Sequence, residues 1–531
     1  PNHHKIRDIN NILGSQGDDV IEGDSSNNTL DGHTGTNTIS FENASAKVVA
    51  NIGGQVILGG TTYTANQATG ATIGTDTILN FQNIKSGSGD DTLIGSSAQN
   101  TIYGGLGADV IYGISGDNKL YGEEGNDTIS GGSGNNTIDG GDGSDTVTYS
   151  GADYVTVTLR GATNGVGNST YGGTNYLDKL ISIENVMGSA GNDTLNGGDG
   201  IDVVSYASAT ENLYIDLGVT TPVSIGTGYG TDTFISIEGA IGGSGNDTIK
   251  GTSGSNVLIG GDGDDTLLPN GNNGIDELDF IDGGSGTDFV SFNFGGNSAV
   301  TLDLANSGIQ NTGKGRVQIV NIENVEGGAG NDRLYGNSSD NTLSGLAGDD
   351  ILVGRAGNNT LDGGADFDTA DYSGVDSLNG INVNLGLSIQ QVQNNGYVGK
   401  DTLISIEKII ATKNSDFIQG STTRTDNSTL YFELGAGNDT IFAGSGANVI
   451  YTSRMSESGT DYTSYNNTVF SGTGSDTVFG SSGNDTFVVS SSDALGSTGN
   501  DTFYGTSGIN TIDYSLVTDT DANRATGGIN V

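Results

Sequence analysis

Aspartate or asparagine recurs every nine residues along much of this sequence, each time after a glycine-rich stretch and just before an apolar position. One unbroken run begins at Asp91 and ends at Asp145, and a second begins at Asp332 and ends at Asp368. The local pattern is G-x-G-x-D-x-apolar, as in GSGDDTLIG from Gly87 to Gly95. Carboxylates and turn carbonyls provide oxygen-only ligands, which suit a hard cation, calcium before magnesium.

The nine-residue period also defines the elements that must position these side chains. It fits neither a helix nor a simple hairpin ladder, and it is typical of a parallel β-roll whose stacked turns are clamped by calcium. We therefore expect an all-β fold, a right-handed parallel β-roll or β-solenoid with stacked calcium-bound turns and inserted β excursions. We call a residue phased when it keeps this nine-residue period. The apolar residue two positions after each phased Asp or Asn is expected on a short strand facing inward. In the first run these residues are Leu93, Ile102, Ile111, Leu120, Ile129, Ile138 and Val147.

Two nonapeptides per coil would place positions eighteen residues apart on the same edge of the roll. Carboxylates would then line one edge and amides the other. The expected carboxylate edges are Asp91, Asp109, Asp127 and Asp145, and Asp332, Asp350 and Asp368. The expected amide edges are Asn100, Asn118 and Asn136, and Asn341 and Asn359. We expect calcium on the Asp edge, each ion bridging successive same-side turns, and amide hydrogen bonds on the Asn edge.

Phased aspartates are the candidate metal ligands, against the alternative that each only closes a local turn through its side chain. The candidates are Asp19, Asp91, Asp109, Asp127, Asp145, Asp193, Asp202, Asp247, Asp265, Asp288, Asp332, Asp350, Asp368, Asp439, Asp476, Asp485 and Asp501. Four phased glutamates, Glu184, Glu238, Glu323 and Glu407, fit equally well as ligands or as solvated turn residues. No residue is expected to be catalytic or to bind an organic cofactor.

Five excursions interrupt the period. Each begins with an aromatic residue four positions after a phased Asp or Asn, and these residues are Phe41, Tyr149, Tyr206, Phe292 and Tyr372. Alternating strand patterns follow, as in VTVTL at 155–159. Four of the five return through a strand that ends in Ile-Glu, nine residues before the next phased Asp. The excursions are therefore predicted to be longer coils or flaps that share the roll, not separate domains.

Composition and charge agree with a solenoid that has only a thin apolar stripe. The chain has 531 residues, 92 of them glycine, 33% hydrophobic residues and a formal net charge of −46 from 64 acidic and 18 basic residues. Such a charge makes nucleic acid and anionic membrane surfaces improbable partners. It also opposes folding unless cations neutralise it. Extracellular calcium modules bind at about 10⁻⁴ to 10⁻³ M, so we expect an unfolded chain in cytosol and a folded one outside.

Other residue types narrow the classes of function. The chain has no cysteine, which excludes disulfides and thiolate metal sites, and no apolar stretch long enough to span a bilayer. Its first residues, PNHHKIRDIN, carry no signal-peptide core. The histidines are His3, His4 and His33, without HExxH, and no G-x-S-x-G has a plausible downstream His. Paired carboxylates follow the repeat, and the glycine-rich stretches lack a phosphate-loop Lys. We therefore expect no enzymatic activity in this chain.

The pattern resembles the RTX family, the calcium-binding nonapeptide-repeat proteins with the motif GGxGxDxUx. Segments such as DKLISIENVMGSAGNDTL at 178–195 and DTFISIEGAIGGSGNDTI at 232–249 resemble parts of large bacterial RTX adhesins and surface-layer proteins. The resemblance covers nearly the whole chain and implies a parallel β-roll, calcium in the turns and one-step (type I) secretion to the bacterial cell surface. Asn at alternate phased positions departs from the motif, which puts half of the expected calcium sites in doubt.

Three functions are consistent with these residues. The first is a calcium-dependent extracellular scaffold, a surface layer or filament that self-associates. The second is an adhesin stalk or ligand-binding region that recognises a cell-surface glycan. The third is the secretion and folding portion of an RTX enzyme or toxin. Repeat regularity predicts a β-roll with five excursions over residues 1–420 and a less regular, C-terminally truncated repeat region over 421–531. Both ends align with the middle of an excursion, which predicts a piece of a longer surface protein.

Overall fold

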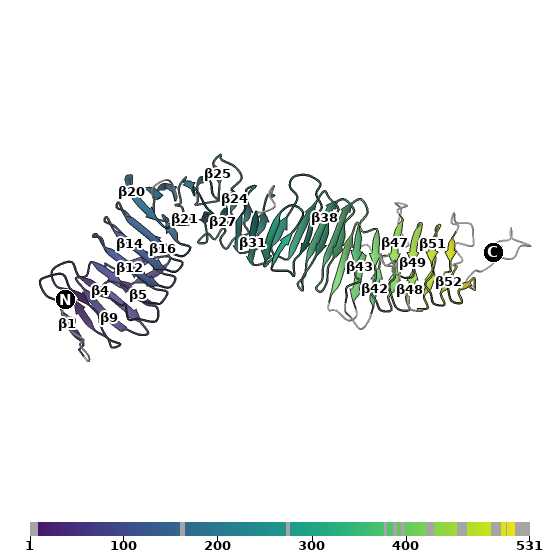
Figure 1. The fold of residues 1–531 in the computed structure, drawn as a ribbon, viewed down its shortest axis with the longest axis horizontal. Helices are drawn as coiled ribbons and strands as arrows, with labels where there is room; N and C mark the ends of the chain where they lie inside the picture. The colour runs from purple at the N-terminus through teal and green to yellow at the C-terminus, as the bar shows by residue number, and fades with distance from the viewer. Residues whose placement is uncertain are drawn as a thin grey trace, which may run out of the picture. The chain divides into compact units, whose positions relative to one another are not determined.

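The computed structural model describes residues 9–159, 165–271, 277–375, 380–385, 390–394, 399–420, 429–453, 465–489, 501–505 and 507–515. Regular structure in these residues consists of β-strands, mostly short and mostly paired in parallel (Figure 1), which confirms the predicted all-β roll. Over the same ranges, no helix is long and apolar enough to cross a membrane. His3 and His4 lie outside the described residues, as do residues 516–531.

The chain divides into two compact units, Pro1–Asp265 and Thr266–Val531. This division does not coincide with the boundary expected at residue 420 from repeat regularity, and that boundary stays a prediction. Each unit contains the same kind of coil, in which successive strands alternate between two parallel sheets.

The most regular coils of the first unit lie between the first and second excursions. Strands separated by eighteen residues pair in parallel, for example Leu93 with Ile111 and Ile102 with Leu120. One sheet stacks β11 (Thr92–Ile94), β13 (Val110–Tyr112), β15 (Thr128–Ser130) and β17 (Thr146–Thr148). The other stacks β10 (Asn83–Lys85), β12 (Thr101–Leu106), β14 (Lys119–Glu124) and β16 (Thr137–Asp142), as Figure 1 shows for the last three.

The second unit repeats this arrangement. One sheet stacks β36 (Asn324–Gly328), β38 (Thr342–Ala347) and β40 (Thr360–Ala365). The other stacks β37 (Arg333–Tyr335), β39 (Ile351–Val353) and β41 (Thr369–Asp371). In both units the predicted spacing of eighteen residues per coil is therefore the observed strand register.

The core is a stripe one side chain wide. All seven residues predicted to face inward, from Leu93 to Val147, are completely buried. Each is the second residue of its strand. A coil gains its apolar contacts mainly from the coils above and below it. No thick core is required, which agrees with the low apolar content of the sequence.

Excursions replace one half-coil by three strands. In the second excursion, β18 (Tyr154–Thr158), β19 (Gly165–Tyr171) and β20 (Thr174–Ile181) join one sheet in the order β16-β20-β19-β18-β22, with β22 at Thr194–Asn196. The middle strand pairs antiparallel with both neighbours, whereas the outer two pair in parallel with the roll. The fifth excursion has the same order in β42 (Ile381–Asn384), β43 (Gln390–Asn394) and β44 (Lys400–Ile404). The prediction that excursions share the roll is confirmed.

Each excursion is anchored by its first aromatic residue, which is buried in all five cases. The Tyr206 hydroxyl donates a 2.6 Å hydrogen bond to Oδ2 of Asp232, a buried residue on the return strand β26 (Thr231–Ile235). Burial raises the pKa of Asp232 to about 7. Where the fourth excursion has Phe292 instead of Tyr, the residue six positions before the returning Glu is Val317, not Asp. The first excursion departs from this pairing, because it begins with Phe41 and has the buried Asp76 six positions before its returning Gln82.

Tyr206→Phe should therefore lower the free energy of unfolding by about 1–3 kcal/mol, because Asp232 would lose its buried donor. Guanidinium denaturation in saturating calcium measures the effect. Tyr154→Phe is the matched control, because Tyr154 is 48% exposed. Equal stability of the Tyr206 variant and the parent protein would contradict the anchoring role.

Candidate metal centres in the stacked turns

The phased aspartates stack along the roll as the eighteen-residue spacing predicts. All of the candidate ligands except Asp19 and Asp501 are at most 2% exposed. The backbone N–H of Asp91 donates to Oδ1 of Asp109, that of Asp109 to Asp127 and that of Asp127 to Asp145, at 2.7 to 2.8 Å. Each carboxylate therefore accepts a hydrogen bond from the coil before it, and we call this series the inner ladder.

The Asn edge forms the same inner ladder with amides. The N–H of Asn100 donates to Oδ1 of Asn118, and the N–H of Asn118 donates to Oδ1 of Asn136. The Asn118 side chain also donates to Oδ1 of Asn136 at 3.1 Å. The predicted amide ladder is confirmed, and so is its equivalent from Asn341 to Asn359.

A second ladder, absent from the sequence-based expectations, runs through the residue before each phased position. The N–H of Ala108 donates to Oδ1 of Asp90, and the N–H of Ser144 donates to Oδ1 of Asn126. Here the later coil donates, so this outer ladder runs opposite to the inner one. Its sequence signal is the doubled Asp or Asn at the end of many turns, such as Asp90-Asp91 and Asn126-Asp127.

Side chains on the return strands of the excursions accept the last bonds of the inner ladders. The returning glutamates Glu184, Glu238, Glu323 and Glu407 accept, through Oε2, the N–H of the preceding phased Asp, at 2.9 to 3.2 Å. They are half-buried and thus act as ladder acceptors, not as solvated turn residues. On the opposite edge Asp178 and Asp401 accept from Asn136 and Asn359. Sequence reasoning missed these two, although each lies six residues before a returning Glu.

Two backbone conformations of the turn distinguish the phased aspartates. In the first, the N–H four residues before the Asp donates to its Oδ2, and we call this a closed turn. The donors to Asp193, Asp247 and Asp332 are Ser189, Gly243 and Gly328, each at 2.6 Å. Asp19, Asp416 and Asp485 receive the same bond. Both oxygens of Asp193, Asp247 and Asp332 accept hydrogen bonds from protein N–H groups. In these closed turns both carboxylate oxygens are therefore hydrogen-bonded without a cation.

In the second conformation, the residues four and two positions before the phased residue have positive φ, and we call this an open turn. Gly105 and Gly107 before Asp109 have φ of 111° and 116°, values that glycine adopts without strain. The same pair of positive φ values precedes Asp127, Asp145, Asp350, Asp368 and Asp439. Oδ2 of each of these six aspartates is buried and receives no hydrogen bond within the described residues.

Open turns that end in Asn show where the turn carbonyls point. The Asn118 Nδ2 donates to the Gly116 carbonyl at 2.9 Å, and the Asn136 Nδ2 donates to the Gly134 carbonyl at 3.1 Å. The carbonyl two positions before the phased residue therefore faces that residue's side chain. In an open turn that ends in Asp, the same carbonyl faces an acceptor, which cannot bond to it. A cation between the two oxygens satisfies both.

The glycine five residues before the phased Asp leaves room for two oxygens in open and closed turns alike, and a Cβ added to Gly242, before the closed turn of Asp247, would have both at 2.3 Å. A Cβ added to Gly104 would lie 2.3 Å from Oδ2 of Asp109 and 2.7 Å from the carbonyl oxygen of Gly122, one coil further along. A carboxylate oxygen and a carbonyl oxygen from two coils thus converge on one glycine Cα. The turn before Asp350 repeats this arrangement at Gly345, with Oδ2 of Asp350 at 2.0 Å and the Gly363 carbonyl at 2.7 Å.

The pKa values of aspartates in open turns are raised. Burial raises the pKa of Asp109 and Asp439 to about 8 and that of Asp350 and Asp368 to about 7. The neighbouring carboxylates Asp91 and Asp127 add to the rise at Asp109. No three or more His, Cys, Asp or Glu side chains gather into a metal cluster anywhere in the described ranges. Calcium at an open turn would therefore depend on one or two carboxylates completed by backbone carbonyls.

The candidate ligands thus fall into groups. Asp109, Asp127, Asp145, Asp350, Asp368 and Asp439 end open turns and could hold calcium. Asp202, Asp265, Asp288 and Asp476 follow turns with the same positive φ values. Asp19, Asp193, Asp247, Asp332 and Asp485 end closed turns, and Asp91 accepts a bond from the Ser86 hydroxyl. Asp501 accepts the N–H of Asp476, and part of its turn lies outside the described residues.

Comparison with known families identifies these turns. The family model of the RTX calcium-binding nonapeptide repeat, in its four-copy form, matches segments that together cover more than half of the chain. The matched residues are 7–39, 85–120, 112–147, 183–207, 241–278, 321–352, 335–370, 432–454, 461–491 and 495–513. The chain belongs to this family. A search of curated proteins finds no match.

Ion-free protein should gain β-structure when the pH is lowered from about 8.5 to 5. The folded pKa values of Asp145, Asp350 and Asp109, about 6, 7 and 8, lie above the unfolded value near 4, so the folded state binds more protons. Their contribution to stability is full below the unfolded pKa and is lost as pH rises through the folded one. Circular dichroism in chelator at several pH values measures this. A gain of structure on raising the pH would contradict it.

Proposed function

We propose that this chain is a calcium-dependent extracellular structural protein, which folds on the bacterial surface and assembles there into a surface layer or filament. The observation that carries the proposal is the series of open turns, in which buried carboxylates face backbone carbonyls with no donor between them. Such turns are stable when calcium is abundant and unstable when it is scarce. RTX repeats are typical of secreted proteins, and folding after export suits this dependence.

The arrangement of the chain supports a scaffold more than a catalyst. Within each unit the strand register is kept through the excursions, which yields stacked coils with ladders of hydrogen bonds along the edges of the turns. The buried carboxylates at the phased positions have roles in the ladders. We propose no catalytic role for this chain. The adhesin alternative is favoured by one feature, a groove on the second unit described below. The third alternative, the secretion portion of an enzyme or toxin, has no specific feature in its favour.

Replacing Asp109 and Asp127 together by Asn should lower the number of bound calcium ions and weaken the dependence of folding on calcium. The new amides would donate to the turn carbonyls as Asn118 and Asn136 do, so the variant should remain folded. Equilibrium dialysis with metal analysis gives the stoichiometry, and circular dichroism gives the calcium midpoint.

Matched controls separate ion binding from turn structure. Asp193→Asn with Asp247→Asn changes two closed turns, and Asn100→Ser with Asn118→Ser changes the amide edge. Both should bind as many ions as the parent protein. An equal loss of bound calcium in the open-turn and closed-turn variants would refute the assignment of ions to open turns.

Assembly is tested by electron microscopy of the purified chain with millimolar calcium and with chelator. Ordered sheets or filaments in calcium alone support the scaffold. Particles that remain monomeric at all calcium concentrations, although folded, would exclude assembly as the role of this chain.

A further inference from the structure

A groove of about 660 Å³ lies on the outer face of one sheet in the second unit. Its floor is formed by Tyr335 and Val353, which occupy paired positions on β37 and β39. One wall follows β33 (Thr301–Asp303) and contains Ala305, and the other follows β41 and contains Gly374 and Val375. The two strands that carry the walls are three strand spacings apart, about 14 Å. The volume falls within the ~300–1,000 Å³ of small-molecule sites.

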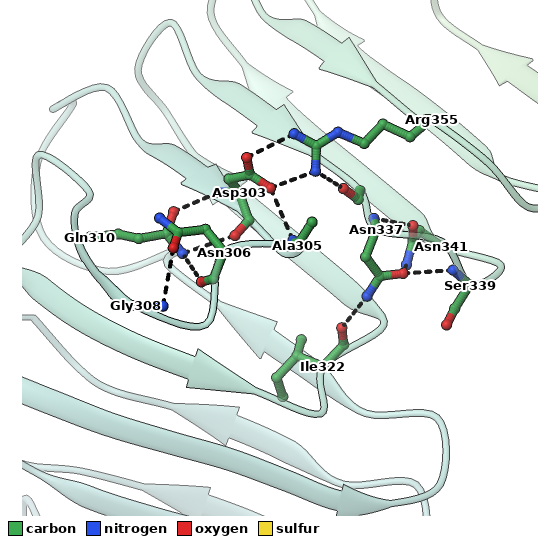
Figure 2. Close-up of polar contacts among 11 residues, drawn as sticks. Asp303, Ala305, Asn306, Gly308, Gln310, Ile322, Asn337, Ser339, Asn341 and Arg355 are labelled. Carbon is green, nitrogen blue, oxygen red and sulfur yellow. Dashed lines mark hydrogen bonds and ion pairs between the residues drawn. The ribbon is translucent and has the colours of Figure 1, made fainter. Parts of the chain in front are cut away.

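Arg355 crosses the groove and fixes one of its walls. Its guanidinium forms a bidentate ion pair with Asp303 at 2.6 and 2.7 Å and donates to the Gly336 carbonyl at 2.7 Å (Figure 2). It also lies 5.5 Å from the centre of the Tyr335 ring. The bidentate pair holds both charges in a fixed geometry. Arg355 thus ties a coil of the roll to the start of the fourth excursion.

Arg355 occupies a turn position that usually suits glycine. Its φ is 64°, and it lies four residues before Asn359 in an open turn. Leu346 has the same place and a positive φ in the preceding half-coil, so the backbone conformation alone does not distinguish Arg355. Its contact with Asp303 does, because this contact reaches from the end of β39 past β37 to β33 of the fourth excursion.

The walls are held in place before any ligand binds. The Gln310 side chain donates to the Asp303 and Asn306 carbonyls at 2.8 and 2.9 Å, which closes the loop that contains Ala305 (Figure 2). The Asn337 side chain accepts the Ser339 N–H and donates to the Ile322 carbonyl (Figure 2). A rigid groove loses little conformational entropy when a ligand binds.

Charge and hydrogen-bonding capacity limit the class of ligand. Asp303 neutralises Arg355, so the groove offers no unpaired cation to an anion. The Asp371 carboxylate accepts the Ser373 N–H through Oδ1, and its Oδ2 receives no bond from the described residues. Ser338 contributes an exposed hydroxyl, and the Tyr335 hydroxyl accepts from Arg333, which leaves its hydrogen available. The floor and walls between these groups are apolar.

From this combination we infer that the groove binds a short neutral oligosaccharide. Sugar hydroxyls both donate and accept, which matches Asp371, Ser338 and Tyr335, and the apolar faces of sugar rings match Val353 and Val375. A saccharide site goes beyond the structural role proposed above and would give the roll a specific attachment to glycan. It requires only a folded second unit and does not depend on assembly.

The test uses the full chain in calcium and saturation-transfer NMR with defined probes. The probes are neutral trisaccharides (maltotriose, cellotriose, chitotriose and mannotriose), sialyllactose as an anionic saccharide, and the peptide Lys-Gly-Lys. We expect at least one neutral trisaccharide to bind. Arg355→Gly and Asp371→Ala should each weaken its binding by about ten-fold or more.

Two variants keep the outcome interpretable. Arg355→Gly introduces the residue that suits positive φ, which offsets part of the stability lost with the ion pair, so the variant should still fold, as circular dichroism will show. Leu346→Gly makes the same change outside the groove and should leave binding unaltered. The inference is overturned if no neutral trisaccharide binds, if only sialyllactose or the peptide binds, or if binding is equal in the Arg355→Gly variant. Failure of assembly would not affect it.

Discussion

Burial of about one carboxylate in each regular coil is the constraint on which this roll depends. Same-edge turns are separated by one strand spacing, about 4.8 Å, at which two unit charges repel by about 3 kcal/mol at an effective dielectric of ~20. The apolar stripe is too thin to offset many such contacts. Four means of relieving the repulsion occur in this chain. They are an N–H donor in closed turns, an amide in place of the carboxylate, a raised pKa in the ion-free state, and a backbone that accommodates calcium in open turns.

The position of a turn relative to the preceding excursion correlates with whether it is closed or open. The first phased Asp after the return of an excursion ends a closed turn at Asp193, Asp247, Asp332 and Asp416. Open turns follow in the coils beyond, as at Asp350 and Asp368. Each excursion thus begins a segment with a coil that is complete in hydrogen bonds, on which the calcium-dependent coils stack. The returning Glu ends the preceding segment by accepting the last ladder bond. Excursions therefore divide a repetitive stack into short cooperative segments.

Much of this could be predicted from the sequence because it depends on spacing alone. The nine-residue period predicted the length of a coil, the residues that face inward and the two edges of the roll. The period resumes without a shift after each excursion, which predicted that the excursions share the roll. The turn conformation could not be predicted. Gly-Gly-Ser-Gly-Asn-Asp at 242–247 is closed, whereas Gly-Gly-Ser-Gly-Thr-Asp at 283–288 has the positive φ values of an open turn. The first turn packs against the excursion, where the Ser244 N–H donates to the Ala209 carbonyl, so tertiary contacts select the conformation. The groove was missed for the same reason, because Asp303, Tyr335 and Arg355 meet only when two excursions flank the same coils.

Calcium-edge anomalous diffraction from crystals grown in calcium tests the central claim most directly, because it locates each ion without any substitution. Anomalous peaks beside Asp109, Asp127, Asp145, Asp350, Asp368 and Asp439, with none beside Asp193, Asp247 and Asp332, are the predicted result. Peaks of equal height at open and closed turns, or at the amide edge beside Asn118 and Asn136, would contradict it.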